Sequence, residues 1–170
     1  MSANTPDKLP EVPMSKSLKR VKAALDAAGV ASEVLEMADG TRTAADAARA
    51  CGCDIDQIAK SIIFRGERSG HVVLFLTAGG NQVDAAKASA LASEDLGKAD
   101  AKLIRTETGF AIGGVSPVGL TRQVRAFYDA RLLDFDQVWA AAGTPRHVFP
   151  AVPADLIRIC GAAPGDFKVS

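Results

Sequence analysis

The spacing of apolar and polar residues in the first third of the chain predicts two helices and a short strand. The first helix is expected over residues 15–28, because four apolar residues recur at helical spacing: Leu18, Val21, Leu25 and Ala28. A short strand is expected at residues 34–37. The second helix, rich in alanine, should run from its capping residue Thr43 to Ala50, and Gly52 should end it.

Two apolar, β-branched runs in the middle of the chain predict a buried β-hairpin. Residues 61–65 and 72–76 form these runs, and the segment 66–70, bounded by glycines, is the expected turn. Because residues 55–59 have the pattern of a helical turn, Lys60 is expected at the point where a helix meets the sheet. A lysine there points along the edge of a cleft or into solvent.

The second half of the chain has three further helical patterns and three short apolar runs. Helices are expected at residues 82–92, 135–142 and 153–159, and Pro153 suits the first turn of the last one. Strands are expected at residues 103–105, 123–128 and 146–149. Since helices and strands alternate irregularly, the sequence predicts an α+β domain around a mixed sheet, and not a doubly wound parallel sheet.

Length and composition indicate one globular domain. The chain has 170 residues, of which 48% are hydrophobic and 24% are charged. Residues 1–14 contain three prolines and no periodicity, so we expect a disordered tail before a single domain at residues 15–170. No apolar run approaches the length of a membrane span, and no apolar signal core begins the chain. We therefore expect a cytoplasmic protein.

Charge excludes a global attraction to polyanions, because the formal net charge is zero. We expect neither DNA nor a membrane as a partner, and any contact with RNA must be local. The first predicted helix carries four basic residues on its polar face: Lys16, Lys19, Arg20 and Lys22. Such a cluster is typical of a solvated face, and a contact with a phosphate backbone is the alternative.

The stretch Gly109–Gly119, with sequence GFAIGGVSPVG, is the strongest candidate for a binding loop. Gly113 and Gly114 allow the backbone to adopt positive φ and to approach a ligand without an intervening Cβ. Pro117 fixes its own φ and favours extended geometry at Ser116. Successive free N–H groups in such a turn can hold an anion or an oxyanion. The alternative interpretation is a plain surface turn.

Four other residues are candidates for chemistry. A desolvated Lys60 would be an anion anchor or an activated amine, and Ser61 offers a hydroxyl beside it. His147 lies on a predicted strand, where it is either a structural hydrogen-bonding group or a catalytic base. Asp129 closes a strand, where it is a turn-capping carboxylate or a substrate contact. The sequence contains no nucleophile elbow and no phosphate-binding P-loop.

The cysteines and histidines do not predict a metal site. Cys51 and Cys53 could supply half of one, but His71 and His147 show no ligand spacing to them. The three cysteines are an odd number, which suits free thiols in a reducing cytosol. We expect no metal and no cofactor.

The order and spacing of several segments resemble one known family. The segments are DQIAKSIIF at residues 56–64, GGVSPVG at 113–119, AGTPRHVF at 142–149 and PADL at 153–156. Together they are similar to the YbaK family of aminoacyl-tRNA deacylases, which is related to the editing domain of bacterial prolyl-tRNA synthetase. The resemblance covers about residues 16–162, and the helix beginning at Thr43 stands where the family has one before its lysine segment.

The resemblance implies a fold and an activity. It implies an α+β fold with a mixed, barrel-like sheet surrounded by helices, and a hydrolase that acts in trans on mischarged tRNA. The expected substrate is tRNA-Pro carrying a small wrong amino acid such as Ala, Ser, Thr or Cys. The expected partners are the acceptor end of aminoacyl-tRNA and, as a second candidate, prolyl-tRNA synthetase. A non-catalytic RNA- or protein-binding module and a hydrolase of another small ester or amide are the alternatives.

The resemblance also assigns roles to residues. Lys60 is the counterpart of the family's key lysine, Gly113 to Pro117 match its Gly-x-x-x-Pro substrate loop, and His147 matches a histidine that shapes the amino-acid pocket in some members. We therefore expect Lys60, Gly113 and Gly114 to be catalytic. The expected substrate-binding residues are Ser61, Val115, Ser116, Pro117, Asp129 and His147.

Overall fold

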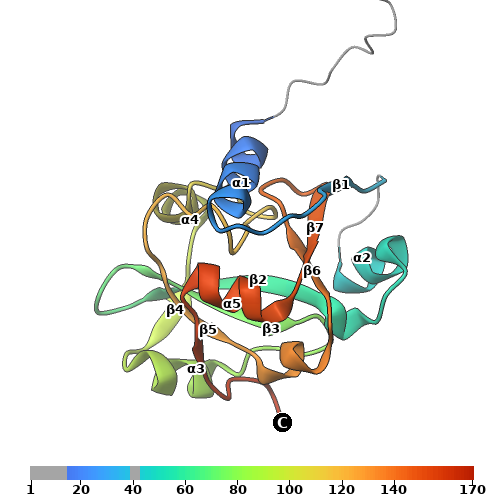
Figure 1. Cartoon of the computed structure of the whole chain (residues 1–170). Helices are drawn as coiled ribbons and strands as arrows, with labels where there is room; N and C mark the ends of the chain where they lie inside the picture. Colours follow the sequence, from blue (N-terminus) through green and yellow to red (C-terminus); the bar gives the residue numbers. More distant parts are fainter. Residues whose placement is uncertain (1–14, 39–42) are drawn as a thin grey trace, which may run out of the picture.

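The chain folds around one mixed β-sheet with helices on its faces and ends (Figure 1). The structure is a computed structural model, and it describes residues 15–38 and 43–170. The predicted tail at residues 1–14 lies outside the described residues, and so does the dipeptide Asp39–Gly40, whose sequence predicts a turn. The predicted mixed-sheet α+β class is confirmed.

The sheet contains eight strands in the described residues and mixes parallel with antiparallel pairs. The strands are β1 (Leu35–Glu36), β2 (Ile58–Gly66), β3 (Val72–Ala78), β4 (Leu96–Lys98), β5 (Arg125–Tyr128), β6 (Val138–Ala141), β7 (His147–Ala151) and β8 (Ala163–Pro164). Their order is β1-β7-β6-β2-β3-β5-β8, and β4 pairs with β2 off this path. Figure 1 shows that the sheet curls, because β6 and β7 run across the direction of β2 and β3.

Polar side chains cap most of the helices. The helices are α1 (Lys16–Ala27), α2 (Ala44–Cys51), α3 (Ala85–Ala92), α4 (Ala101–Thr108) and α5 (Pro153–Cys160), with 3-10 helices η1 (Ile55–Gln57) and η2 (Ala130–Asp134). Thr43 and Asp46 form a reciprocal capping box at the start of α2, and Gly52 ends that helix in the left-handed conformation, as predicted. Every helix in the described residues is too short or too polar to span a membrane.

The core lies on both faces of β3, whose seven residues are all buried. Leu74 and Leu76 face the larger apolar cluster, which also includes Leu156 of α5. Val73 and Phe75 face a second cluster on the opposite side. The predicted hairpin is confirmed, since β2 and β3 pair antiparallel from Ala59–Ala78 to Arg65–Val72. This hairpin is the rigid base on which the candidate site is built.

Two predicted elements in the second half are wrong. Residues 103–105 lie in helix α4 and not in a strand, because Asp100 caps a helix there and accepts a hydrogen bond from the N–H of Leu103. Residues 135–142 contain strand β6 and not a helix. Alanine favours helix, but pairing of β6 with β2 and β7 outweighs this propensity and buries Val138 and Ala140.

The region before Lys60 also differs from its prediction. Helical structure ends at Gln57, and Ile58 and Ala59 already pair with β6. Lys60 therefore lies within β2, opposite Thr77 of β3, and not at the junction of a helix and a strand. The short strands β4 and β8 were not predicted, since segments of three and two residues carry no periodic signal.

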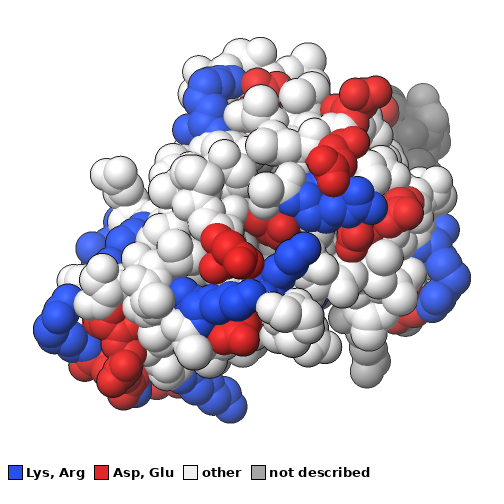
Figure 2. Space-filling model, turned by 90° about the horizontal axis from the view of Figure 1, so that it is seen from below, with Lys and Arg blue, Asp and Glu red and all other residues white. Residues whose placement is uncertain are grey.

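The surface agrees with the zero net charge. On the face seen in Figure 2, basic and acidic side chains are interspersed, and no large region has a single sign. Several neighbours of opposite charge form ion pairs, such as Arg131 with Asp56 at 2.9 Å and Arg125 with Glu94 at 2.7 Å. In both pairs the arginine is partly exposed, while the carboxylate is the more buried partner.

Candidate active site

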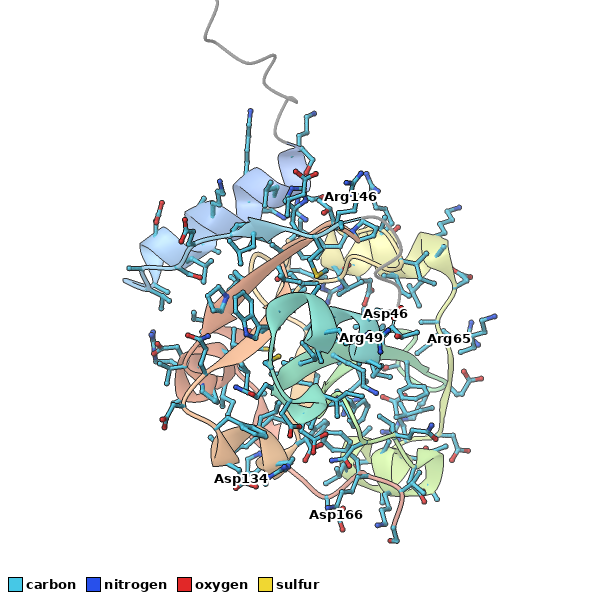
Figure 3. The ribbon with its side chains drawn as sticks, turned by 90° about the vertical axis from the view of Figure 1, so that its right-hand side faces the viewer. Asp46, Arg49, Arg65, Asp134, Arg146 and Asp166 are labelled. Atoms are coloured by element: carbon cyan, nitrogen blue, oxygen red, sulfur yellow. The ribbon has the colours of Figure 1, made fainter. Side chains whose placement is uncertain are left out.

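A cavity of about 520 Å³ opens between β2, α2 and the glycine loop Gly109–Gly119. This volume lies within the range of about 300–1,000 Å³ that is usual for small-molecule sites. The predicted site residues on its wall are Lys60, Ser61, Gly113, Val115 and His147. Figure 3 looks onto α2, which lies in front of the sheet and carries Asp46 and Arg49 on its outer surface.

Lys60 is half-buried in the wall of the cavity, and a backbone carbonyl holds its amine. Its Nζ donates a hydrogen bond of 2.7 Å to the backbone carbonyl of Asn81, which follows the end of β3. Burial lowers the pKa of Lys60, and the carboxylates of Asp56 and Asp129 partly oppose this shift by favouring the charged form. The result is a partly desolvated cation beside an apolar cavity.

Strand β2 has an open edge where it passes the cavity. β6 pairs with β2 at Ile58 and Ala59, and β4 pairs with it from Phe64 onwards. Along Lys60–Ile63, β3 is the strand partner on the other side. Within residues 15–38 and 43–170, backbone groups of this segment therefore face the cavity without a neighbouring strand, and they can bind a polar ligand.

Ser61 contributes a hydroxyl that lies against the same wall. Its Oγ is buried and has no hydrogen-bond partner within the described part of the chain. Leaving a buried hydroxyl unpaired costs about 1–3 kcal/mol, and such groups are often found at functional sites. Because Ser61 pairs with Leu76 and Lys60 with Thr77, the two side chains leave opposite faces of β2, and the unsatisfied hydroxyl lies one residue from the lysine along the strand.

The glycine loop presents its backbone to the cavity at Gly113. Gly113 has a φ of +92°, and a Cβ built on it would meet no atom within 4 Å. Gly114 lies behind it, where a Cβ would be 2.8 Å from the carbonyl carbon of Thr144. The N–H of Gly114 is already used, because it donates to the carbonyl of Ala111 at 3.1 Å. The N–H of Gly114 is therefore engaged within the loop itself.

His147 forms the wall that faces this loop. It begins β7, and its Nδ1 lies 2.6 Å from the hydroxyl of Thr144. The carbonyl of His147 accepts a hydrogen bond from the N–H of Ala142 at 2.8 Å. The contact with Thr144 orients the ring at the cavity wall, and the backbone hydrogen bond fixes the start of β7.

A family model describing an aminoacyl-tRNA editing domain matches residues 38–159, which include all of these walls. The chain belongs to the aminoacyl-tRNA editing domain family. The family resemblance seen in the sequence is therefore confirmed, and the chain has an aminoacyl-tRNA editing role.

This editing domain is similar to several known proteins. A protein provisionally assigned as a trans-editing enzyme for prolyl tRNA synthetase has a crystal structure with 43% identity and a TM-score of 0.85, covering 92% of this chain and 99% of that one. Hypothetical protein APE2540 is 27% identical with a TM-score of 0.79, covering 88% and 99%. The uncharacterized protein YwhH of Bacillus subtilis is 29% identical, covering 82% of this chain and 88% of its own.

Four predicted site residues of the editing domain do not line the cavity: Gly114, which lies behind Gly113, and Ser116, Pro117 and Asp129. Ser116 and Pro117 are buried behind the loop, where the hydroxyl of Ser116 accepts a hydrogen bond from the N–H of Val118 at 3.1 Å. Asp129 is also buried, and it is described below. The geometry indicates that Ser116 and Pro117 shape the loop, and their contact with substrate stays a prediction.

Asp129 supports Lys60 indirectly. Its carboxylate accepts hydrogen bonds from the N–H of Ala78 at 3.1 Å, from the N–H of Arg131 at 3.0 Å and from the side-chain amide of Asn81 at 2.8 Å. Asn81 in turn accepts the hydrogen bond from Lys60. Asp129 therefore caps η2 and fixes the turn that holds the lysine, and its contact with substrate stays a prediction.

Sequence reasoning missed several residues of the site. Asn81 follows two glycines that were interpreted as a chain break, and nothing in its local pattern indicates that its carbonyl faces Lys60. Ile104 and Trp139 line the cavity from elements that were predicted in the wrong class. Among the described residues, no group of three or more His, Cys, Asp or Glu side chains could hold a metal ion.

Proposed function

We propose that this editing domain is a deacylase that acts in trans and hydrolyses the ester of mischarged aminoacyl-tRNA. The observation that carries the proposal is a single cavity whose wall combines the half-buried cation of Lys60 with the open backbone at Gly113. The proposed substrate is tRNA-Pro carrying a small wrong amino acid, such as Ala, Ser, Thr or Cys. The 43% identity to a protein provisionally assigned as a trans-editing enzyme for prolyl tRNA synthetase supports this choice.

The glycine loop would stabilise the transition state. Hydrolysis of an aminoacyl ester passes through a tetrahedral oxyanion, which needs hydrogen-bond donors aimed at the developing charge. Since the N–H of Gly114 is engaged by Ala111, we assign this role to backbone N–H groups at Gly113 and Val115, which line the cavity. Loss of one such donor typically costs about 2.7–4 kcal/mol of transition-state stabilisation.

Lys60 would hold the terminal adenosine as a point charge on its phosphate or ribose. The hydroxyl of the ribose next to the ester would assist a water molecule as the nucleophile, so that the protein needs no nucleophilic side chain. Because the ester is already activated, correct positioning of these groups supplies most of the catalysis required.

The walls of the cavity would select small amino acids by excluding larger ones. Val115 and Ile104 narrow the cavity with branched side chains, and His147 closes another side. Excluding large side chains discriminates more strongly than attracting small ones, because one missing methylene changes the binding free energy by only about 1–3 kcal/mol. Phenylalanine and leucine should therefore remain on their tRNA.

A panel of charged tRNA tests the proposal. We would charge tRNA-Pro with Ala, Ser, Thr, Cys, Phe or Leu and measure release by the wild type and by Lys60→Ala. Rapid release of the small amino acids by the wild type alone would support the function. Binding without release would identify a non-catalytic RNA-binding module, and efficient release of Phe or Leu would contradict the proposed selectivity.

A further inference from the structure

Helix α1 lies against the glycine loop, although the two are far apart in sequence (Figure 1). Arg20 of α1 makes the contact with its planar guanidinium. Its Nε donates to the carbonyl of Gly119 at 2.6 Å, and its Nη2 donates to the carbonyl of Gly109 at 2.8 Å. One side chain therefore joins the two ends of the loop that lines the cavity.

The guanidinium of Arg20 also lies over an aromatic ring. It lies 4.4 Å from the ring centre of Phe110, a fully buried residue at the start of the loop. Burial and the nearby charge of Arg105 lower the pKa of Arg20, but an arginine still remains charged at any physiological pH. The prediction of a solvated basic face is therefore wrong for Arg20, while Lys16 and Lys19 are exposed as expected.

Glycines allow α1 and the loop to approach each other closely. A Cβ on Gly119 would lie 3.1 Å from the backbone oxygen of Arg20, and one on Gly109 would lie 2.7 Å from its guanidinium. The loop is closed further by the N–H of Thr121, which donates to the carbonyl of Thr108 at 3.2 Å. The close backbone contact, the two hydrogen bonds from Arg20 and the hydrogen bond between Thr121 and Thr108 therefore all act on the same two ends of the loop.

We infer that Arg20 is a positioning residue, which sets the span of the glycine loop so that Gly113 and Val115 present their backbone to the substrate. The inference rests on the proposed deacylase function. Arg20 does not line the cavity, so it acts through the loop and does not touch the substrate. Misplacement of catalytic groups by about 1 Å can cost about 100-fold in rate, and a loop without its clamp can shift by this amount.

Lysine cannot replace arginine in this role. Two carbonyls at opposite ends of a loop require two donors at a fixed separation, which a planar guanidinium supplies and a single ammonium does not. Arg20→Lys keeps the charge and the aliphatic stem, so it tests the fork geometry alone. We expect Arg20→Ala and Arg20→Lys to lower kcat by about 10- to 100-fold with little change in KM.

The experiment compares these variants with Arg158→Ala, a matched control. Arg158 lies on α5 and pairs with Asp155 at 3.2 Å on the surface, so its removal should leave kcat unchanged. Methylguanidinium added to Arg20→Ala should restore part of the lost kcat and should not affect the other variants. Equal loss of kcat in Arg158→Ala, or full activity of Arg20→Lys, would overturn the inference.

Hydrogen exchange in the free proteins supplies a readout that does not depend on activity. In Arg20→Ala and Arg20→Lys, amides of residues 109–119 should exchange at least about 10-fold faster, while those of β3 should remain protected. Unchanged exchange in the loop would overturn the inference even if kcat falls. If the wild type deacylates no tRNA, the proposed function fails, and hydrogen exchange still decides whether Arg20 fixes the loop.

Discussion

The amine of Lys60 lies between an apolar cavity and the backbone carbonyl of Asn81, which a network of hydrogen bonds fixes in place. Asp129 fixes the turn that contains Asn81, and Asn81 accepts the hydrogen bond of the lysine. Because burial disfavours the ammonium, the folded-state pKa of Lys60 lies below its ordinary value of 10.5. The residue is thus placed for binding an anion at a cost in stability.

Replacement of Lys60 should separate activity from stability. We expect Lys60→Met to lower kcat/KM for deacylation by about 100-fold or more, because a preorganised charge is lost. A lysine with a lowered folded-state pKa destabilises the fold below that pKa, and this cost shrinks as pH rises from that pKa to the ordinary value of 10.5. Urea unfolding should therefore show Lys60→Met more stable than the wild type at pH 7, with a smaller difference at pH 10. A Lys60→Met protein that is less stable than the wild type at pH 7 would contradict this prediction.

The pH dependence of turnover follows from the same shift. Activity that needs the ammonium of Lys60 should fall on the alkaline side at a pH below 10.5, after subtraction of spontaneous ester hydrolysis. A Lys60→Arg variant should move this fall to higher pH, because arginine keeps its proton. An identical alkaline limb in both proteins would show that another group controls it.

At the scale of single elements, the glycine loop and the helix beside it form one unit. Helix α1 holds the ends of the loop through Arg20, and the backbone of Thr144 supports its middle at Gly114. Each contact is made possible by a glycine, since a Cβ at Gly109 or Gly114 would collide with its neighbour. Substitutions in the loop should therefore act by different routes.

Gly113→Ala and Gly114→Ala should both lower kcat more than they weaken binding of tRNA. Alanine at Gly113 fits the space but is strained at a φ of +92°, by about 1–2 kcal/mol. Alanine at Gly114 must displace the backbone of Thr144, so we expect the larger loss of kcat there. Single-turnover kinetics and tRNA affinity would be measured together. Gly70→Ala is the control, because Gly70 also has a positive φ, at +75°, and a Cβ built on it would meet no atom within 4 Å.

Glu107 joins α4 to the start of β3, and it should dominate the acid sensitivity of this junction. Burial alone would raise its pKa, but hydrogen bonds from His71 and from the N–H of Val72, together with the charge of Arg122, lower it. Since its folded-state pKa is lowered, its stabilisation is present above about pH 4.5 and is lost as pH falls further.

Glu107→Gln should therefore lower the free energy of unfolding by about 1–3 kcal/mol at pH 7 and by less at pH 3. Urea titrations at the two pH values measure this difference. Glu67 is exposed and pairs with Arg65 on the surface, so Glu67→Gln should change the free energy of unfolding by less than about 0.5 kcal/mol. Equal effects of the two substitutions would contradict the assignment.

The sequence predicted the elements with strong local signals and missed those set by pairing. The cap at Thr43, the hairpin of β2 and β3 and helix α5 were correct because caps, β-branched runs and an N-terminal proline act locally. The alanine-rich β6 is a strand only because two neighbouring strands pair with it. The partners of Lys60 and Arg20 were missed for the same reason, since Asn81 and the glycine carbonyls are distant in sequence.

On the scale of the whole molecule, recognition of tRNA must be local. The net charge is zero, and the face in Figure 2 mixes both signs. No general field would concentrate a polyanion at the cavity, so the proposed function requires contacts around Lys60 and the glycine loop to recognise the acceptor end. The reaction would then depend on the substrate's own groups as much as on the protein.

This dependence leads to a prediction for the substrate. A tRNA whose terminal ribose lacks the hydroxyl next to the ester should be deacylated much more slowly, by about 100-fold, because the group that assists the water is missing. Treatment with a chelator should leave the rate of the normal substrate unchanged. Cleavage of the deoxy substrate at the normal rate, or loss of activity with the chelator, would refute the mechanism while leaving the deacylase assignment open to the tRNA panel.

The open edge of β2 at Lys60–Ile63 has a consequence for how the protein behaves at high concentration. An unpaired strand edge is a template on which another chain can add a strand and begin aggregation. Here β6 and β4 bound the gap at both ends, and it lies within the cavity. A strand of a second molecule would have to enter that short gap from the side. The fold thus leaves this edge open towards the cavity while protecting it from self-association.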